Sequence, residues 1–182
     1  MLDQTAVITL ASSFSDPSDG EAFKSRDLVL LLLECTPAPF SRDQFTPGHV
    51  TASGLVLAPD DERVLLVHHR RLARWLLPGG HVESEDATAG AAARREVVEE
   101  TSAALRGGDP PLAGIDVHGI PAKGSEPYHL HHDLIFLFHA TSDRLQVSAE
   151  SNEVAWCHPR DFELYVVPGN IRRAYRRVLS LI

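Results

Sequence analysis

The sequence has few of the features that mark disulfide scaffolds, zinc modules or membrane proteins. It contains only two cysteines, Cys35 and Cys157, which lie far apart and lack a Cys-x-x-Cys spacing. The longest strongly apolar run, residues 28–33, is far shorter than the roughly 20 residues that span a bilayer. We therefore expect no disulfide framework, no zinc site built from cysteines and no membrane segment.

Positive charge is scarce as well. The chain has 17 Lys and Arg residues against 25 Asp and Glu residues, a formal net charge of -8. Because binding to the phosphate backbone of nucleic acids needs clustered cations, we expect no nucleic-acid partner. The one basic stripe lies near the C-terminus, and we interpret it as a solvated helix face paired with acidic neighbours: Arg172, Arg173, Arg176 and Arg177.

A recognisable export signal is also missing. Asp3 stands where a secretory signal needs positive charge, and the apolar stretch at residues 6–11 is shorter than a typical signal core. Widely separated cysteines fit a reducing compartment. We therefore expect a cytoplasmic protein.

The length of 182 residues fits one well-cored domain with room for a short appendage. We divide the chain into a helical N-terminal extension, residues 1–47, and a main domain, residues 48–182, that ends in a helix. The apolar run at 28–33 either covers the core of that domain or forms the face of a homodimer, and the sequence leaves both open.

The predicted secondary structure places strand pairs on both sides of one central helix. An Ala-rich run predicts that helix, and alternating apolar residues between turn signals predict the strands. The fold class is therefore α/β or α+β, with a mixed sheet. The expected elements are helices over 21–34, 87–104 and 171–181 and strands over 50–58, 63–68, 115–120, 133–140 and 153–157.

The central helix carries the strongest chemical signal. Glu96, Glu99 and Glu100 stand at positions i, i+3 and i+4, so their carboxylates share one helix face. Like charges repel there unless a cation lies among them, and hard oxygen ligands suit Mg²⁺ or Mn²⁺. Arg95 precedes Glu99 by four residues and can orient its carboxylate. A solvated acidic helix face is the alternative for these residues taken alone.

The segment before the helix favours the metal site. Gly79 and Gly80 break the chain after Pro78 and let the backbone approach a bound metal or phosphate closely. The span from Gly80 to Ala103 then resembles the Nudix box, G-x5-E-x7-R-E-U-x-E-E-x-G-U, where U is a bulky aliphatic residue. The resemblance implies a Nudix-type α/β/α sandwich with a mixed β-sheet.

The chain departs from the Nudix box at two places. Its loop carries one extra residue, so the first glutamate of the pattern falls on Asp86 or Ala87, depending on the end from which it is counted. Glu83 or Glu85 is the alternative loop acid. Ser102 stands where the pattern has its late glycine, and a helix can end without glycine there.

The resemblance implies roles for several of these residues. Family members hold divalent ions through glutamates that match Glu96, Glu99 and Glu100 and often through a backbone carbonyl near Gly79. The catalytic residues implied are Arg95, Glu96 and Glu99. Glu99 is one candidate general base, and Glu150 and Glu153 are its rivals, because some family members place the base outside the box.

A second polar cluster lies further along the chain. If a strand begins there, His129, His131 and Asp133 share one face and can line a pocket. The alternative is a polar strand end at the rim of the sheet. The basic loop at residues 68–74 either meets an anionic substrate or is solvated. The candidate substrate-binding residues are Gly80, His81, Asp86, His129, His131 and Glu153.

These patterns predict a Mg²⁺- or Mn²⁺-dependent hydrolase that cleaves a diphosphate linkage in a nucleoside diphosphate derivative or a nucleoside triphosphate. A catalytically silent Nudix-like module that binds a nucleotide or a protein is the alternative. An isomerase of isoprenoid diphosphates is disfavoured, because Cys35 and Cys157 lie outside the segments expected to form the pocket. The identity of the small-molecule substrate is not encoded in the box.

Overall fold

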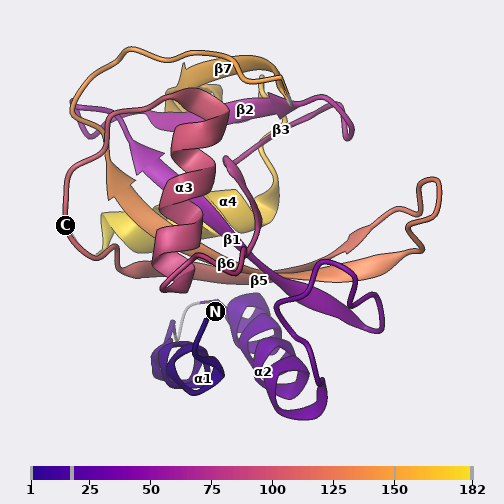
Figure 1. Ribbon diagram of the computed structural model, residues 1–182. Coiled ribbons are helices and arrows are strands. Elements are labelled where there is room, and N and C mark those ends of the chain that lie inside the picture. Colours follow the sequence, from indigo (N-terminus) through magenta and orange to yellow (C-terminus); the bar gives the residue numbers. More distant parts are fainter. Residues whose placement is uncertain (1, 17–18, 150, 181–182) are drawn as a thin grey trace.

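The computed structural model describes residues 2–16, 19–149 and 151–180 of the chain. Helices pack on both sides of a curled sheet, with the two N-terminal helices against one end of it (Figure 1). The elements are α1 (Gln4–Ser13), α2 (Gly20–Cys35), β1 (Gly48–Leu57), β2 (Val64–His69), β3 (Arg74–Leu76), β4 (Gly79–His81), α3 (Ala89–Thr101), β5 (Leu112–Ile120), β6 (His129–His139), β7 (Ser151–Cys157), a 3₁₀ turn (Pro159–Asp161) and α4 (Gly169–Leu179).

The sheet is mixed. Its main path runs β3-β2-β1-β6-β5, while β4 pairs with β1 and β7 pairs with β2. β1 and β6 are parallel, and the other pairs are antiparallel. Residues of β1 alternate between two hydrophobic clusters, one shared with α1, α2 and α3 and the other shared with α4. This arrangement confirms the predicted α/β/α class.

The predicted strands and helices are present, with corrections at their ends. Gly79 and Gly80, expected as a break, belong to strand β4 instead. Gly79 packs so closely against β1 that a side chain would not fit there. β6 begins at His129, four residues before the predicted start at Asp133. β7 begins at Ser151, two residues before the predicted start at Glu153. Helix α1 and strand β3 were not predicted.

The N-terminal helices contribute to the core of the sheet. The Asp19 carboxylate caps α2 by accepting hydrogen bonds from the backbone amides of Glu21 and Ala22. Of the apolar run at 28–33, Val29, Leu32 and Leu33 are buried in the cluster that α3 and the sheet share. This side of the run therefore covers the core, while Leu28 and Leu31 on its other side are exposed. The division of the chain at residue 48 remains a prediction.

Two further findings bear on the sequence predictions. The arginines of α4 pair with acidic residues, with Arg172 to Glu163, Arg173 to Asp19 and Arg177 to Asp16, as expected of a charged face. Among the described residues, no helix combines the length and apolar character needed to cross a bilayer.

Candidate functional site

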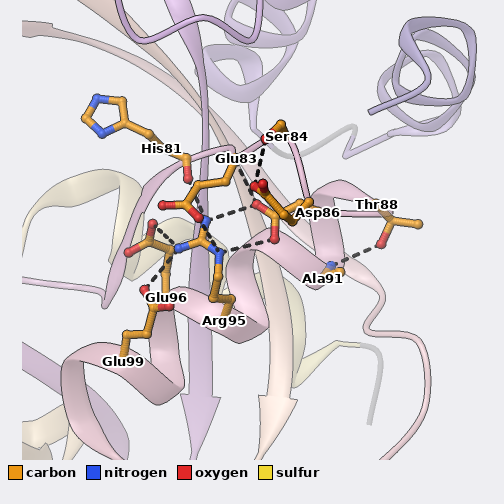
Figure 2. Close-up of polar contacts among 10 residues, drawn as sticks. His81, Glu83, Ser84, Asp86, Thr88, Ala91, Arg95, Glu96 and Glu99 are labelled. Atoms are coloured by element: carbon orange, nitrogen blue, oxygen red, sulfur yellow. Dashed lines mark hydrogen bonds and ion pairs between the residues drawn. The ribbon is translucent and has the colours of Figure 1, made fainter. Parts of the chain in front are cut away.

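Arg95 of α3 lies at the centre of an ion-pair network. Its Nη1 donates to the Oε1 atom of Glu96 at 2.9 Å and to the Oε2 atom of Glu99 at 3.0 Å. Its Nη2 also donates to the backbone carbonyl of His81 at 2.8 Å. Figure 2 shows the guanidinium between the glutamates of the helix and the loop that precedes it. Arg95 therefore fixes two of the three helix carboxylates and the end of β4 together.

Asp86 is the loop acid that holds Arg95 from the other side. Its two carboxylate oxygens accept from Nε and Nη2 of Arg95 at 3.1 and 2.9 Å, and Oδ2 also accepts from the Glu83 amide. Burial opposes the charge on this 6% exposed side chain, but these hydrogen bonds outweigh it and lower the pKa of Asp86. In return, the hydrogen bonds that Arg95 donates to Asp86 raise the pKa of Arg95.

The other two acidic side chains of the loop contribute less to this network. The Glu83 carboxylate lies 3.9 Å from Nε of Arg95, and its side chain is 59% exposed. Glu85 is exposed and accepts from the neighbouring Ser84 hydroxyl. Of the three loop acids, Asp86 is therefore the one that forms a close ion pair with Arg95 of the helix.

Helix α3 begins and ends at residues that fix its position. The Thr88 hydroxyl accepts from the Ala91 amide at 3.0 Å and caps the N-terminus. At the other end Ser102 has φ 53° and ψ 24°, the left-handed conformation that glycine adopts without cost. The helix therefore keeps the expected cap conformation without the glycine of the pattern.

The three glutamates of α3 differ in exposure. The Glu99 side chain is 57% exposed and that of Glu96 is 14% exposed, while Glu100 is buried. A Cβ atom added to Gly80 would lie 2.8 Å from the Glu96 carboxylate, and one added to Gly79 would lie 2.3 Å from the Ser53 hydroxyl. The two glycines therefore let β4 pass directly beside the carboxylates.

These carboxylates line one wall of a cavity of about 740 Å³. Its walls also carry basic side chains from three separate loops, namely Arg42, Arg70, Arg71 and Lys123. Arg71 pairs with Glu126 at 2.8 Å, and Arg70 donates to the Asn152 side chain. The cavity thus joins an acidic wall to a basic rim, an arrangement that suits a metal-bound anionic ligand.

A group of histidines on β1, β4 and β6 lies at and behind one wall of the cavity, where His81 and His131 form part of the lining. The parallel register places His49 of β1 beside His131 of β6. The His49 ring lies 5.0 Å from the His81 ring, 5.1 Å from the His129 ring and 4.9 Å from the His131 ring, measured between centroids. Burial, with further contributions from the neighbouring histidines, lowers the pKa of His81 to about 4 and lowers that of His49.

Asp133 follows the histidines on β6 and is buried. Its Oδ1 accepts from the hydroxyls of Thr51 and Ser53 on β1, each at 3.0 Å. Burial raises the pKa of this carboxyl. Thr51 and Ser53, which line the cavity, and His49, which packs against His131, were not predicted from the sequence, because only the pairing of β1 with β6 brings them to this place.

The cavity brings most of the candidate residues together. Its lining includes Gly79, Gly80, His81, Arg95, Glu96, Glu99, Glu100 and His131. Among the described residues, Asp86, His129 and Glu153 lie outside the lining. His129 packs behind His131, and Glu153 is exposed on β7 opposite His68. Glu150 lies outside the described residues.

Comparison with solved structures supports the fold. A Caenorhabditis elegans Ap4A hydrolase in a binary complex aligns with TM-score 0.50 and 17% identity over 72% of this chain and 96% of that chain. The NUDIX domain of Shewanella oneidensis NrtR with ADP ribose aligns with TM-score 0.51 and 18% identity, over 72% and 86%. The Escherichia coli dihydroneopterin triphosphate pyrophosphohydrolase gives TM-score 0.51 and 20% identity, over 72% and 95%.

Comparison of the sequence alone gives the family. A search of curated protein sequences finds no match. The family model described as the NUDIX domain, however, matches residues 48–180, which begin with β1 and end after α4. The matched residues include Arg95 and the three glutamates of α3 that line the cavity. The chain therefore belongs to the NUDIX domain family, the family of the Nudix pyrophosphohydrolases.

Proposed function

We propose that this Nudix pyrophosphohydrolase uses Mg²⁺ or Mn²⁺ to cleave the diphosphate linkage of a nucleoside diphosphate derivative or a nucleoside triphosphate. One observation carries the proposal: Glu96, Glu99 and Glu100 lie together on one wall of a cavity that has arginines and a lysine on its rim. A diphosphate fits between them, because its charge needs cations on both sides.

The donor set fits a hard divalent ion. Glu96, Glu99 and Glu100 offer carboxylate oxygens, and the glycines of β4 leave the backbone beside Glu96 uncovered by side chains. We assign the metal to these glutamates and to the Gly79 carbonyl. When bound, the ion supplies charge neutralisation of the diphosphate and lowers the pKa of a coordinated water.

The protein side chains divide the remaining work between positioning and proton transfer. Arg95 is occupied by Asp86, Glu96 and Glu99, so we assign it to holding carboxylates in place. Glu99 is the most exposed of the helix glutamates and faces the cavity, which favours it as the base that accepts a proton from the attacking water. Glu153 is the rival base, and its exposed position outside the cavity lining makes it the weaker candidate.

The basic rim supports an extended anionic substrate. Arg42, Arg70, Arg71 and Lys123 come from three loops that line the same cavity as α3. We propose that they hold phosphate groups, while His81 and His131 contact the substrate from the wall between them. The solved structures that share this fold include proteins described by Ap4A, ADP ribose and dihydroneopterin triphosphate, which supports a substrate of this general class.

A substrate panel tests the proposal. The purified chain is assayed against dinucleoside polyphosphates, nucleoside diphosphate sugars and nucleoside triphosphates, with Mg²⁺ and with Mn²⁺, by release of phosphate or nucleoside monophosphate. Metal-dependent turnover that Glu96→Gln abolishes is expected. Tight nucleotide binding without turnover of any panel member would instead support the catalytically silent binding module.

Location and assembly are proposed on narrower grounds. Both cysteines are free thiols in the structure, which supports a cytoplasmic location.

Leu28 and Leu31 are 44% and 55% exposed on α2 and support a homodimer through that helix. Light scattering of the wild type and of Leu31→Glu tests this assembly, and a monomeric wild type would exclude it.

A further inference from the structure

Three histidines converge behind the cavity wall. One ring nitrogen from each of His49, His129 and His131 lies within 4.8 Å of a nitrogen from each of the other two. The parallel pairing of β1 with β6 places His49 beside His131, and His129 stands two residues earlier on the same face of β6. The group is therefore built on the sheet and not on a surface loop.

Backbone hydrogen bonds fix two of these rings. The Nδ1 atom of His49 lies 3.1 Å from the Gln44 carbonyl oxygen, and the Nδ1 atom of His129 lies 2.9 Å from the Pro127 carbonyl oxygen. A carbonyl only accepts, so each Nδ1 carries the proton and each Nε2 keeps a lone pair. This is the arrangement by which metal-binding histidines are oriented in proteins.

His49 supplies the decisive detail. The residue is 1% exposed, and its Nε2 atom is buried without a hydrogen-bond partner in the part of the chain that the structure describes. Leaving a buried polar nitrogen unsatisfied costs about 1–3 kcal/mol. An ion at the centre of the three rings would satisfy it.

Burial also favours the ligand form of His131. Together with the nearby His49, His81 and His118 rings, it lowers the pKa of His131 far below its ordinary value. Neutral imidazole is the form that binds metal ions, so His131 needs no deprotonation at neutral pH.

We propose that His49, His129 and His131 bind a divalent transition ion of the Zn²⁺ class, separate from the carboxylate site on α3. Imidazole nitrogens suit Zn²⁺, whereas Mg²⁺ prefers oxygens. Metal–nitrogen bonds of about 2.0–2.1 Å place ligand nitrogens about 3.4 Å apart, so the rings would approach one another on binding. His131 lines the cavity, which leaves a fourth position for water or a phosphate oxygen.

Zinc titration tests the proposal without an activity assay. The full chain is stripped with a chelator, exchanged into buffer with excess Mg²⁺ and titrated with Zn²⁺ in a calorimeter. One Zn²⁺ per chain is expected for the wild type. His129→Gln and His131→Gln should each weaken Zn²⁺ binding by more than about 100-fold, since loss of a ligand exceeds the 10–100-fold typical of outer-shell changes.

Two variants serve as matched controls. His139→Gln removes another histidine of β6. The His139 side chain contacts Asp61 and not the three-histidine cluster. Glu99→Gln removes a carboxylate from the other site. Both should keep wild-type Zn²⁺ affinity, and this separates failure of the histidine site from failure of the proposed function.

The proposal fails if the wild type binds no Zn²⁺, or if the two histidine variants bind as tightly as the wild type. Zn²⁺ binding that is lost in Glu99→Gln alone also contradicts it. Circular dichroism checks that the variants fold. If neither His129→Gln nor His131→Gln folds, Co²⁺ is added to the wild type instead. Visible absorption typical of nitrogen-ligated, low-coordinate Co²⁺ supports the site. The weak spectrum of oxygen-ligated, octahedral Co²⁺ overturns it.

Discussion

Two groups of potential metal ligands lie at one cavity and were not equally visible in the sequence. The acidic group, Glu96, Glu99 and Glu100, comes from little more than one turn of α3, next to Arg95 in the sequence. The histidine group joins His49 to His129 and His131, which lie 80 or more residues away. Helix geometry alone places the acids together, whereas the histidines meet only through the register of β1 with β6.

The two groups also manage their charges differently. The carboxylates of Glu96 and Glu99 share the positive charge of Arg95, which Asp86 holds from behind. In the histidine group, burial lowers the pKa of His49 and of His131 and so favours their neutral forms. An acidic group with an internal cation suits a hard ion that enters with substrate. A neutral imidazole group suits a transition ion that stays bound.

The largest expected effect tests the acidic group. Glu99→Gln keeps the size of the side chain and its hydrogen bond from Arg95 but removes the charge. We expect kcat to fall by about 10²- to 10⁴-fold, because both metal binding and proton transfer are affected. Mg²⁺ affinity should fall with it. Steady-state kinetics and Mg²⁺ calorimetry on the best panel substrate measure both, and unchanged values in the variant contradict the assignment.

Asp86→Asn should have the next largest effect. The variant keeps the shape of the side chain but no longer balances Arg95 with a charge, so the carboxylates that Arg95 holds should become less well placed. We expect kcat/KM to fall by about 10- to 100-fold, the range typical of residues that orient metal ligands. Glu85→Gln is the matched control, because the exposed Glu85 side chain accepts a hydrogen bond from Ser84 and lies outside the cavity lining. Equal losses in the two variants would contradict the role of Asp86.

The lowered pKa of Asp86 also predicts a pH dependence of stability. The folded pKa of Asp86 is lowered below its ordinary value of 3.8. Its stabilising contribution is therefore present at neutral pH and is lost as pH falls below about 4 through the lowered pKa. The difference in free energy of unfolding between the wild type and Asp86→Asn should shrink in that window. Urea unfolding at a series of pH values checks this, and a pH-independent difference would refute it.

A smaller effect is expected at the histidine group. His131 lines the cavity from β6, whereas the glutamates line it from α3, so His131→Ala should remove binding that substrate and transition state share. We expect KM to rise by about tenfold, the equivalent of roughly 1.4 kcal/mol, with kcat nearly unchanged. His139→Gln is the control on the same strand. A fall in kcat without a change in KM would place His131 with the catalytic residues instead.

The same contrast explains how much the sequence could predict. The helix acids, the glycines of β4 and the class of fold follow from local patterns, because each depends on residues close together in the chain. The sequence could not choose among Glu83, Glu85 and Asp86, since the choice depends on how the longer loop folds toward Arg95. His49 was missed because the identity of its neighbours depends on strand pairing, which has no local signature.

The smallest expected effect separates the scaffold of the acidic group from its chemistry. Ser102 ends α3 in the left-handed conformation, with φ 53° and its amide donating to the Val98 carbonyl oxygen. For a non-glycine residue this conformation costs roughly 1–2 kcal/mol. Glycine avoids that cost, but its greater freedom in the unfolded chain cancels part of the gain in stability. Ser102→Gly should therefore raise the free energy of unfolding by about 0.5–1 kcal/mol, and the thermal midpoint by about 1–4 °C. Ser102→Ala keeps the cost of the left-handed conformation and should show no such gain.

Turnover should be unchanged in both variants, because Ser102 is exposed and the carboxylates lie earlier on the helix. Differential scanning calorimetry with parallel kinetics measures both quantities, and a stabilised Ser102→Ala would show that the backbone conformation is not the cause.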